Sequence, residues 1–462
     1  MQTLRRVCQP YVGTRSFYRG ALAVMIPVTV QQLINNLFNM VDNLMVGSLD
    51  INGLAMSAVN VANKPYIIFF GVFFGLSGAA GLMISQYYGA KDIKTCQGLF
   101  ALQMAIGLCN SLLFFALLRF FPETIMRIFV TDSRTVELGM QYLRIICYSY
   151  IPVAISNTCI FSMRSLGLNR TSMLVSLATM GVNAACNYVL IFGKLGAPAM
   201  GVAGAAWGTV IARLFEMVIY LSLLVRGRML FTLDMTAFLR LPRAVIKSYF
   251  KKAVPLITNE IFWTFGMNMY FWCYARLDEA ALPAITIAEQ CSQIAAVMAM
   301  GTASAVSVMI GTELGAGRLQ EAKANSKKLF SLVLMIGLVC MLLCCLLGVT
   351  LPYAFQVSQE LRTLAAQIAL VTGVLSPLGF VYSFCFYCLR AGGDTRNAML
   401  LDSGYMWALP VPVSIAMGLL LPGHISILLA AFVVQFLMNA KAVLALYVVR
   451  RGKWLRNITM EE

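Results

Sequence analysis

Long uninterrupted apolar runs dominate this sequence and decide what the chain can fold into. Of its 462 residues, 60% are hydrophobic and only 12% carry a charged side chain, whereas a soluble globular domain is charged at about 25% of its positions. So few charges cannot cover so apolar an interior with a polar surface. The natural solvent of the chain is therefore lipid, since a helix of about 20 residues crosses a bilayer core of about 30 Å.

Twelve such runs recur along the sequence. They are continuous rather than alternating, which favours membrane helices over the strands of a barrel. We expect an all-α polytopic membrane protein with twelve transmembrane helices. The predicted spans cover residues 18–45, 53–83, 95–121, 135–164, 169–192, 200–225, 246–275, 282–312, 327–350, 362–389, 397–421 and 425–449.

The positive charge follows the predicted topology. The formal net charge is +16, and Lys and Arg gather in every second connection, including the segments 1–19, 226–252 and 450–456. This positive-inside pattern predicts that both termini are cytoplasmic and that the chain crosses the inner (plasma) membrane many times. The basic charge is thereby explained by the lipid bilayer, and we expect no nucleic-acid partner.

The sequence contains an internal repeat. "MRSLGLNRTSML" (163–174) aligns with "LRAGGDTRNAML" (389–400), and "MISQYYGA" (83–90) aligns with "MIGTELGA" (309–316). The offset along the chain is the same for both pairs. Each half begins on the same side of the membrane, so the repeat is parallel, and such repeats place the substrate between the halves near the middle of the membrane.

The repeat divides the chain into an N-terminal six-helix lobe over 1–225, a cytoplasmic linker over 226–245 and a C-terminal six-helix lobe over 246–462. Pro27 and Pro255 occupy matching positions in the two leading helices. Because proline removes a helical hydrogen bond, we predict that both are hinges.

A polar stripe runs along the first predicted span. Gln31, Asn35, Asn39 and Asp42 are spaced by four, four and three residues, so they share one helix face. An acid at the centre of a membrane helix costs about 2.5–3.5 kcal/mol on an insertion scale. The stripe is interpreted as a cavity wall with a titratable or ion-binding carboxylate, and the alternative is a seam of hydrogen bonds between helices.

Further polar groups lie in the neighbouring predicted spans. Asn157, Asn183, Asn187 and Thr209 could join Asp42 as oxygen ligands of Na⁺, or as a hydrogen-bonded cage around a protonated carboxyl group. The alternative is that these side chains are buried polar groups that simply satisfy one another. No structural metal site is expected, because no metal-ligand spacing such as H-E-x-x-H occurs.

The seventh predicted span carries a second acidic face. Glu260, Trp263 and Met267 follow at helical spacing, and a carboxylate beside an aromatic ring and a flexible thioether suits a large organic cation. The alternative is an ordinary packing stripe with an acid that reaches the membrane surface. Asp402 lies in the eleventh span, nearer its cytoplasmic end, and whether Glu260 or Asp402 takes part in transport stays open.

Signatures of membrane enzymes are missing from the sequence. No G-x-x-x-x-G-K-[ST] phosphate-binding loop occurs. We therefore expect neither enzymatic activity nor a cofactor.

Five motifs resemble the multidrug and toxic-compound extrusion (MATE) family, and its bacterial members in particular. They are "NMVDNLMVG" in the first span, "SQYYGAKD" after the second, "RSLGLNRT" after the fourth, "GVAGAAWGTVIA" in the sixth and "AGGDTR" in the second half. The resemblance covers nearly the whole chain.

The resemblance implies two six-helix lobes in a V and a secondary active transporter with alternating access. Such a transporter exports small organic cations (multidrug efflux) by antiport with H⁺ or Na⁺. Two alternatives stay open: a lipid-linked oligosaccharide flippase of the same superfamily, or an exporter of one specific metabolite. The chain is expected to act as a monomer.

The resemblance also assigns residues. Asp42 matches the first-helix aspartate of the family, and Asn183, Thr209 and Asn157 match polar residues of its cation site. Glu260 matches the seventh-helix glutamate of some members.

This chain departs from the family pattern at two points. Asn187 stands where the fifth-helix N-x-x-x-D pattern has an aspartate, and the tenth span, 362–389, carries no acid. Fewer carboxylates are then available for Na⁺, so the coupling ion stays open between H⁺ and Na⁺, with a slight preference for H⁺.

Overall fold

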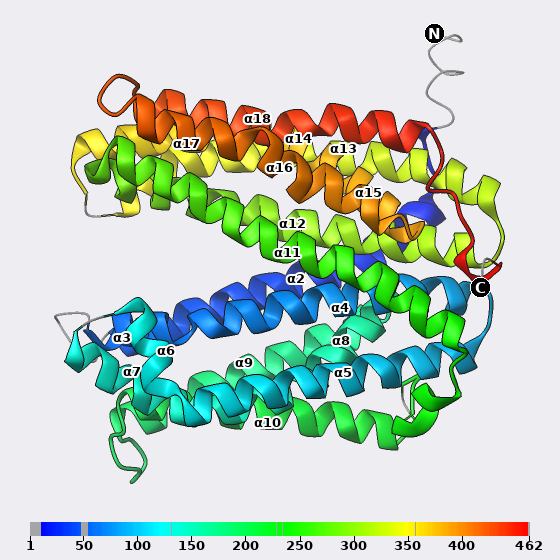
Figure 1. Ribbon diagram of the computed structural model, residues 1–462, viewed down its shortest axis with the longest axis horizontal. Helices are drawn as coiled ribbons and strands as arrows, with labels where there is room; N and C mark the ends of the chain where they lie inside the picture. Colours follow the sequence, from blue (N-terminus) through cyan, green and yellow to red (C-terminus); the bar gives the residue numbers. More distant parts are fainter. Residues whose placement is uncertain are drawn as a thin grey trace. The chain divides into compact units, whose positions relative to one another are not determined.

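The computed structural model describes residues 11–47, 54–130, 132–227, 229–232, 234–355 and 357–460 (Figure 1). Within these ranges the chain forms helices joined by short connections, and no strand is present among them. The expected all-α fold is confirmed.

The helices are α2 (Arg15–Gly47), α3 (Leu54–Ala62), α4 (Lys64–Gly89), α5 (Ile93–Phe120), α6 (Pro122–Phe129), α7 (Ser133–Ile146), α8 (Tyr150–Ser165), α9 (Asn169–Phe192), α10 (Val202–Val225), α11 (Arg243–Leu277), α12 (Leu282–Gly315), α13 (Leu319–Thr350), α14 (Gln359–Ala391), α15 (Thr395–Met399), α16 (Tyr405–Ala408), α17 (Pro410–Leu420) and α18 (Ile427–Arg450). A π-helix, Leu400–Gly404, joins α15 to α16. Short 3₁₀ turns span Cys147–Ser149, Met235–Arg240, Glu279–Ala281, Leu351–Ala354 and Ile458–Met460.

Eleven helical segments of the described chain are long and apolar enough to cross a membrane. The eleven do not include α11, although its 35 residues exceed the length that a crossing needs. The reason is composition: α11 begins with four basic residues, and Asn259, Glu260 and Asn268 lower the hydropathy of the stretch that follows.

Two predicted spans are interrupted where proline begins a new helix. The span 53–83 consists of α3 and α4, with Pro65 in the first turn of α4. The span 397–421 breaks at Leu409, whose φ of −134° and ψ of −65° are not helical, directly before Pro410 at the start of α17. A proline at the first helical position is favourable because that position needs no N–H donor.

Matching backbone turns confirm the sequence repeat. Lys91 and Gly317, which the repeat aligns, follow α4 and α12 and have left-handed φ values of 63° and 75°. Gly167 and Gly393, aligned by the same offset, follow α8 and α14 with φ values of 76° and 77°. Equivalent helices of the two halves therefore end in the same kind of left-handed turn.

The chain forms two compact units. Unit 1 contains the chain up to Thr29, the segment Ser85–Lys91 and the chain from Ser248 onward, and unit 2 contains Val30–Ile84 and Asp92–Lys247. Helix α2 thus passes from unit 1 into unit 2 soon after Pro27. The predicted lobe boundaries stay a prediction, because the units group residues by contact and the lobes group them by repeat.

The beginning of α2 completes the core of unit 1. Ala21 and Met25 are buried in one cluster with Val306 and Ile310 of α12 and Phe384 of α14. In the same unit α14 packs against α12, α13 and α18, which Figure 1 shows running alongside it.

The ends of α4 and α12 cross through two glycines within unit 1. A Cβ atom on Gly89 would collide with the carbonyl oxygen of Thr312, and a Cβ atom on Gly315 would collide with the carbonyl oxygen of Gln86. The repeat aligns Gly89 with Gly315, and it aligns Gln86 with Thr312. The two copies of the repeat therefore contact each other through equivalent residues. Small residues permit such a close approach between membrane helices.

Aromatic side chains fill the core of unit 2. The ring centroid of Phe69 lies 4.8 Å from that of Tyr150 and 5.5 Å from that of Phe114. Phe69 and Tyr150 are almost completely buried, so α4, α5 and α8 are held together where these rings meet.

Candidate functional site

A chain of hydrogen bonds in unit 2 joins four of the five residues predicted for the coupling cation. The Asn187 amide nitrogen donates to Asp42 Oδ1 at 2.5 Å and to Asn183 Oδ1 at 3.2 Å. The Asn183 amide nitrogen donates in turn to Thr209 Oγ1 at 3.5 Å. The chain thus begins at the α2 carboxylate, passes through α9 and ends on α10.

The two asparagines in the middle of this chain of hydrogen bonds are buried, whereas Asp42 at its end is partly accessible to solvent. Asn183 and Asn187 are 1% and 0% exposed, whereas Asp42 is half-buried. The Asn187 Oδ1 atom is buried without a hydrogen-bond partner among the described residues. A buried acceptor left unpaired costs about 1–3 kcal/mol, so a hydrogen-bond donor that reached this atom would stabilise the site.

Gly208 explains how Asn187 reaches this position. A Cβ atom at Gly208 of α10 would overlap Asn187 Oδ1. The absence of a side chain lets α9 and α10 approach closely, which is the usual role of small residues at membrane helix crossings.

Asn157, the fifth predicted member, lies apart from the chain of hydrogen bonds. It is half-buried on α8, and within the described residues its side chain makes no hydrogen bond. Its predicted role therefore has no geometric support from the other four.

A buried ion pair lies on α10 of the same unit. Arg213 Nη1 is 3.0 Å from Glu216 Oε2, with the glutamate side chain only 4% exposed. The guanidinium also lies 5.1 Å from the ring centroid of Phe38, four residues before Asp42 on α2. The positive charge of Arg213 is thus matched by its own helix neighbour while it rests against α2.

The predicted polar stripe of α2 is buried at Gln31 and exposed at Asn35. Gln31 is 2% exposed; its amide nitrogen donates to Ser176 Oγ at 3.0 Å and its carbonyl oxygen accepts from Arg164 Nη2 at 3.1 Å. Both ends of the Gln31 amide are therefore used inside unit 2. Asn35 is exposed, and the side chain of Asn39 lies outside the described part of the chain.

The predicted organic-cation face on α11 belongs to unit 1. Glu260 is half-buried, and Trp263 and Met267 expose 40% and 39% of their surface. Pro255 lies inside the same helix, five residues before Glu260. An acid and two accessible apolar side chains on successive turns keep the geometry that the spacing predicted.

Sequence reasoning left Asp402 open and missed its partners. Lys441 Nζ lies 2.6 Å from Asp402 Oδ1, and the Asn259 amide nitrogen donates to Asp402 Oδ2 at 3.0 Å. The Ser403 N–H donates to Asn259 Oδ1 at 3.3 Å, and Lys441 lies 4.0 Å from the ring centroid of Tyr382. The one available signal was a lysine inside the twelfth predicted span, because an intramembrane charge needs a partner.

Asp402 lies in the π-helix, and Lys441 lies on α18. Single π-turns inside α-helices are frequent at functional sites. Among the residues that the structure describes, no group of three or more His, Cys, Asp or Glu side chains is placed to hold a metal ion.

These observations define a class of protein. Many apolar helices, an internal repeat and ionisable groups buried within the spans are together typical of polytopic secondary transporters. Comparison with known proteins gives the family. The family model MatE matches residues 27–189 and again residues 255–416, one match in each half. The chain belongs to the MatE family, the multidrug and toxic-compound extrusion transporters, so the resemblance seen in the sequence is confirmed.

Individual relatives agree with this assignment. The chain is 26% identical over 326 residues to "Probable multidrug resistance protein NorM" of Halalkalibacterium halodurans, covering 69% of each chain. It is 20% identical over 452 residues to "Uncharacterized transporter YisQ" of Bacillus subtilis, covering 98% of this chain and 94% of that one. The protein is therefore a multi-pass membrane transporter and not an enzyme.

A solved structure shares the fold. The chain matches the "Crystal structure of MATE in complex with MaL6" with a TM-score of 0.86 at 16% identity, over 97% of this chain and 98% of that one. Twelve membrane helices are typical of the family, and α11 supplies the crossing that hydropathy alone leaves out.

Proposed function

We propose that this transporter exports small organic cations from the cytoplasm in exchange for H⁺, with multidrug efflux as its physiological role. The observation that carries the proposal is the hydrogen-bonded chain from Asp42 to Thr209, which ends on one side at a half-buried carboxylate. The name of the NorM relative, a probable multidrug resistance protein, supports multidrug efflux. The transporter would lie in the plasma membrane as a monomer with both termini cytoplasmic.

The scarcity of carboxylates favours H⁺ over Na⁺. Asp42 accepts a hydrogen bond from the Asn187 amide and is joined by no second acid in the hydrogen-bonded chain, whereas a metal ion needs several converging oxygens. A proton added to Asp42 converts the carboxylate into a donor. If the Asn187 amide then flips, so that its oxygen and nitrogen exchange places, its buried and unpaired Oδ1 accepts that proton in a hydrogen bond.

Exchange follows from competition at the carboxylate. Ionised Asp42 attracts the organic cation, and protonation removes that attraction on the side where the substrate must leave. Each ligand shifts the inward and outward states only through its different affinity for them. The lobes 1–225 and 246–462 would alternate about hinges at Pro27 and Pro255, with Glu260, Trp263 and Met267 lining the path of the cation.

Transport in proteoliposomes tests the proposal. The full chain is reconstituted, and uptake of a fluorescent lipophilic cation is followed under an imposed pH gradient and then under a Na⁺ gradient. We expect movement under the pH gradient, lost in Asp42→Asn and retained in Asp278→Asn, which makes the same substitution at an exposed helix cap.

Three outcomes contradict the proposal in different ways. Movement driven only by Na⁺ overturns the choice of coupling ion. Full transport in Asp42→Asn overturns the role of the carboxylate. No movement under either gradient overturns organic-cation export and favours the flippase or the exporter of a single metabolite.

A further inference from the structure

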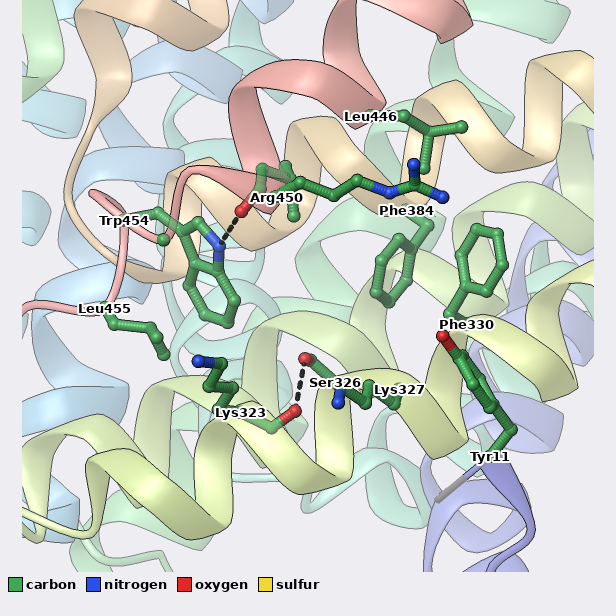
Figure 2. A pocket seen from close by; sticks show the side chains of 12 residues that line it. Tyr11, Lys323, Ser326, Lys327, Phe330, Phe384, Leu446, Arg450, Trp454 and Leu455 are labelled. Atoms are coloured by element: carbon green, nitrogen blue, oxygen red, sulfur yellow. Dashed lines mark hydrogen bonds between the residues drawn. The ribbon is translucent and has the colours of Figure 1, made fainter. Parts of the chain in front are cut away.

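A pocket of about 180 Å³ opens in unit 1 where α13 begins and α18 ends (Figure 2). It lies within one compact unit, far along the sequence from the Asp42 cluster. Its lining is Tyr11, Lys323, Ser326, Lys327, Phe330, Phe384, Leu446, Val449, Arg450, Gly452, Trp454 and Leu455.

One side of the pocket is strongly basic. Lys323 and Lys327 are one turn apart on α13, Arg450 is the last residue of α18, and all three are exposed. Within the described chain none of them makes an ion pair with an acid, and no Asp or Glu lines the pocket. Glu321, the acid nearest in sequence, pairs instead with Arg318 at 3.4 Å.

The other side is apolar and preformed. The rings of Phe330 and Phe384 meet edge to face with centroids 5.4 Å apart, and Phe384 is 4% exposed. The Trp454 indole N–H donates to the Val449 carbonyl at 2.9 Å, which fixes the chain after α18 against the pocket. Figure 2 shows the basic and the aromatic side chains around the same space.

The position of the pocket along its helices predicts its level in the membrane. Its walls come from the start of the candidate span Leu319–Ala354 and the end of the candidate span Ile427–Arg450, so it lies where these spans leave the hydrocarbon. Clusters of Lys and Arg mark the cytoplasmic end of a span, and Trp454 and Tyr11 are residue types that gather at the interface. The pocket therefore lies at headgroup depth.

We infer that this pocket binds an anionic phospholipid of the cytoplasmic leaflet. Its phosphodiester would lie among Lys323, Lys327 and Arg450, and an acyl chain would cover Phe330 and Phe384. Basic pockets between membrane helices on the cytoplasmic side are suited to such headgroups. Free phosphate shares the charge but leaves the apolar wall uncovered, and a zwitterionic lipid offers acyl chains without net charge.

The test measures lipid retained by the purified full chain. The protein in detergent is titrated with phosphatidylglycerol, and bound lipid is counted by native mass spectrometry while thermal unfolding is followed in parallel. The pocket variant combines Lys323→Gln, Lys327→Gln and Arg450→Gln. The matched control combines Arg243→Gln, Lys247→Gln and Lys251→Gln, which removes the same residue types from exposed positions of α11.

We expect phosphatidylglycerol to raise the unfolding temperature of the native chain and of the control. The pocket variant should bind it at least about tenfold more weakly, because each basic residue near an anionic headgroup contributes roughly fivefold in affinity. Phosphatidylcholine and glycerol phosphate should stabilise none of the three proteins.

Each other result overturns the inference. Equal binding by the pocket variant and the control means that the lipid associates through general surface charge. Equal stabilisation by glycerol phosphate makes the ligand a free phosphate, and equal stabilisation by phosphatidylcholine makes the basic side irrelevant. The three single variants are measured alongside, so a fold defect in the triple variant leaves the comparison intact.

Discussion

The buried Asp402–Lys441 pair predicts a pronounced rescue in a double-mutant cycle. Asp402 and Lys441 are 8% and 5% exposed, and removing one partner of a buried pair costs about 3–5 kcal/mol because the other charge is left uncompensated. In Lys441→Met, Asp402 keeps its Asn259 donor at 3.0 Å. In Asp402→Asn, Lys441 keeps the ring of Tyr382 at 4.0 Å. These residual contacts place both losses near the lower end, at about 3 kcal/mol each.

The double variant Asp402→Asn/Lys441→Met removes both charges and keeps both shapes. We expect it to lose only about 1 kcal/mol, because replacing a whole buried pair with neutral groups is often close to neutral. The free energy of unfolding is measured in mixed micelles by SDS titration with circular dichroism. The exposed pair Glu123–Arg127, with both side chains 54% exposed, is the control cycle and should show a coupling under about 1 kcal/mol.

Additive losses at Asp402 and Lys441 would refute this reasoning. They would mean that neither charge depends on the other, and that the 2.6 Å separation of Lys441 Nζ and Asp402 Oδ1 is not an energetically important pairing. Single variants as stable as the native chain would refute it equally.

Three further predictions concern glycine spacing, backbone conformation and a helix cap. Gly208→Ala should crowd Asn187 and lower cation transport at least about tenfold. The control Gly181→Ala on α9, where a Cβ atom meets nothing within 4 Å, should transport normally. Equal transport rates in the two variants would contradict the role of the close approach of α9 and α10 at Gly208. Lys91→Gly should raise the free energy of unfolding by about 1 kcal/mol, since it relieves a left-handed φ of 63°, and a lower unfolding temperature would count against it. The carboxylate of Asp132 accepts hydrogen bonds from the hydroxyl and the backbone N–H of Thr135. These hydrogen bonds hold the pKa of Asp132 below its ordinary value. The Asp132 cap therefore protects the first turn of α7 fully above the ordinary pKa, and this protection is lost as the pH falls through the lowered pKa. Hydrogen exchange should show the loss of protection on acidification, and in Asp132→Ala it should show the loss at every pH. Protection of α7 that does not change with pH would disprove the prediction.

Much of the fold was accessible from the sequence because lipid imposes a simple rule. Each crossing must satisfy its own backbone, so apolar length predicts helices, and the constant offset between the two halves predicts that equivalent helices end alike. The left-handed turns at Gly167 and Gly393 agree with that offset. Breaks at Leu409 and before Pro65 were harder to predict, since a proline in an apolar run can either kink a helix or begin one.

The candidate site was only partly accessible, for a physical reason. Helical periodicity places Asp42 and Gln31 on one face of their own helix, but it does not say which helix that face meets. The structure pairs Gln31 with Ser176 and Arg164, contacts that depend on tertiary packing. The π-helix adds a further obstacle, because one inserted residue rotates the following side chains by about 100° and changes what Asp402 faces.

The division of α2 between the two units has a consequence for how the protein is made. Ala21 and Met25 belong to a core whose other members, such as Val306 and Phe384, are synthesised much later. During synthesis, the apolar surface that α2 later buries in unit 1 is therefore covered only by lipid until the second half of the polypeptide has been inserted. A gene severed in the central linker would encode a C-terminal fragment whose core lacks Ala21 and Met25, and co-expression with the N-terminal fragment in one membrane would restore that core. The dependence runs one way, because unit 2 contains no residue beyond Lys247.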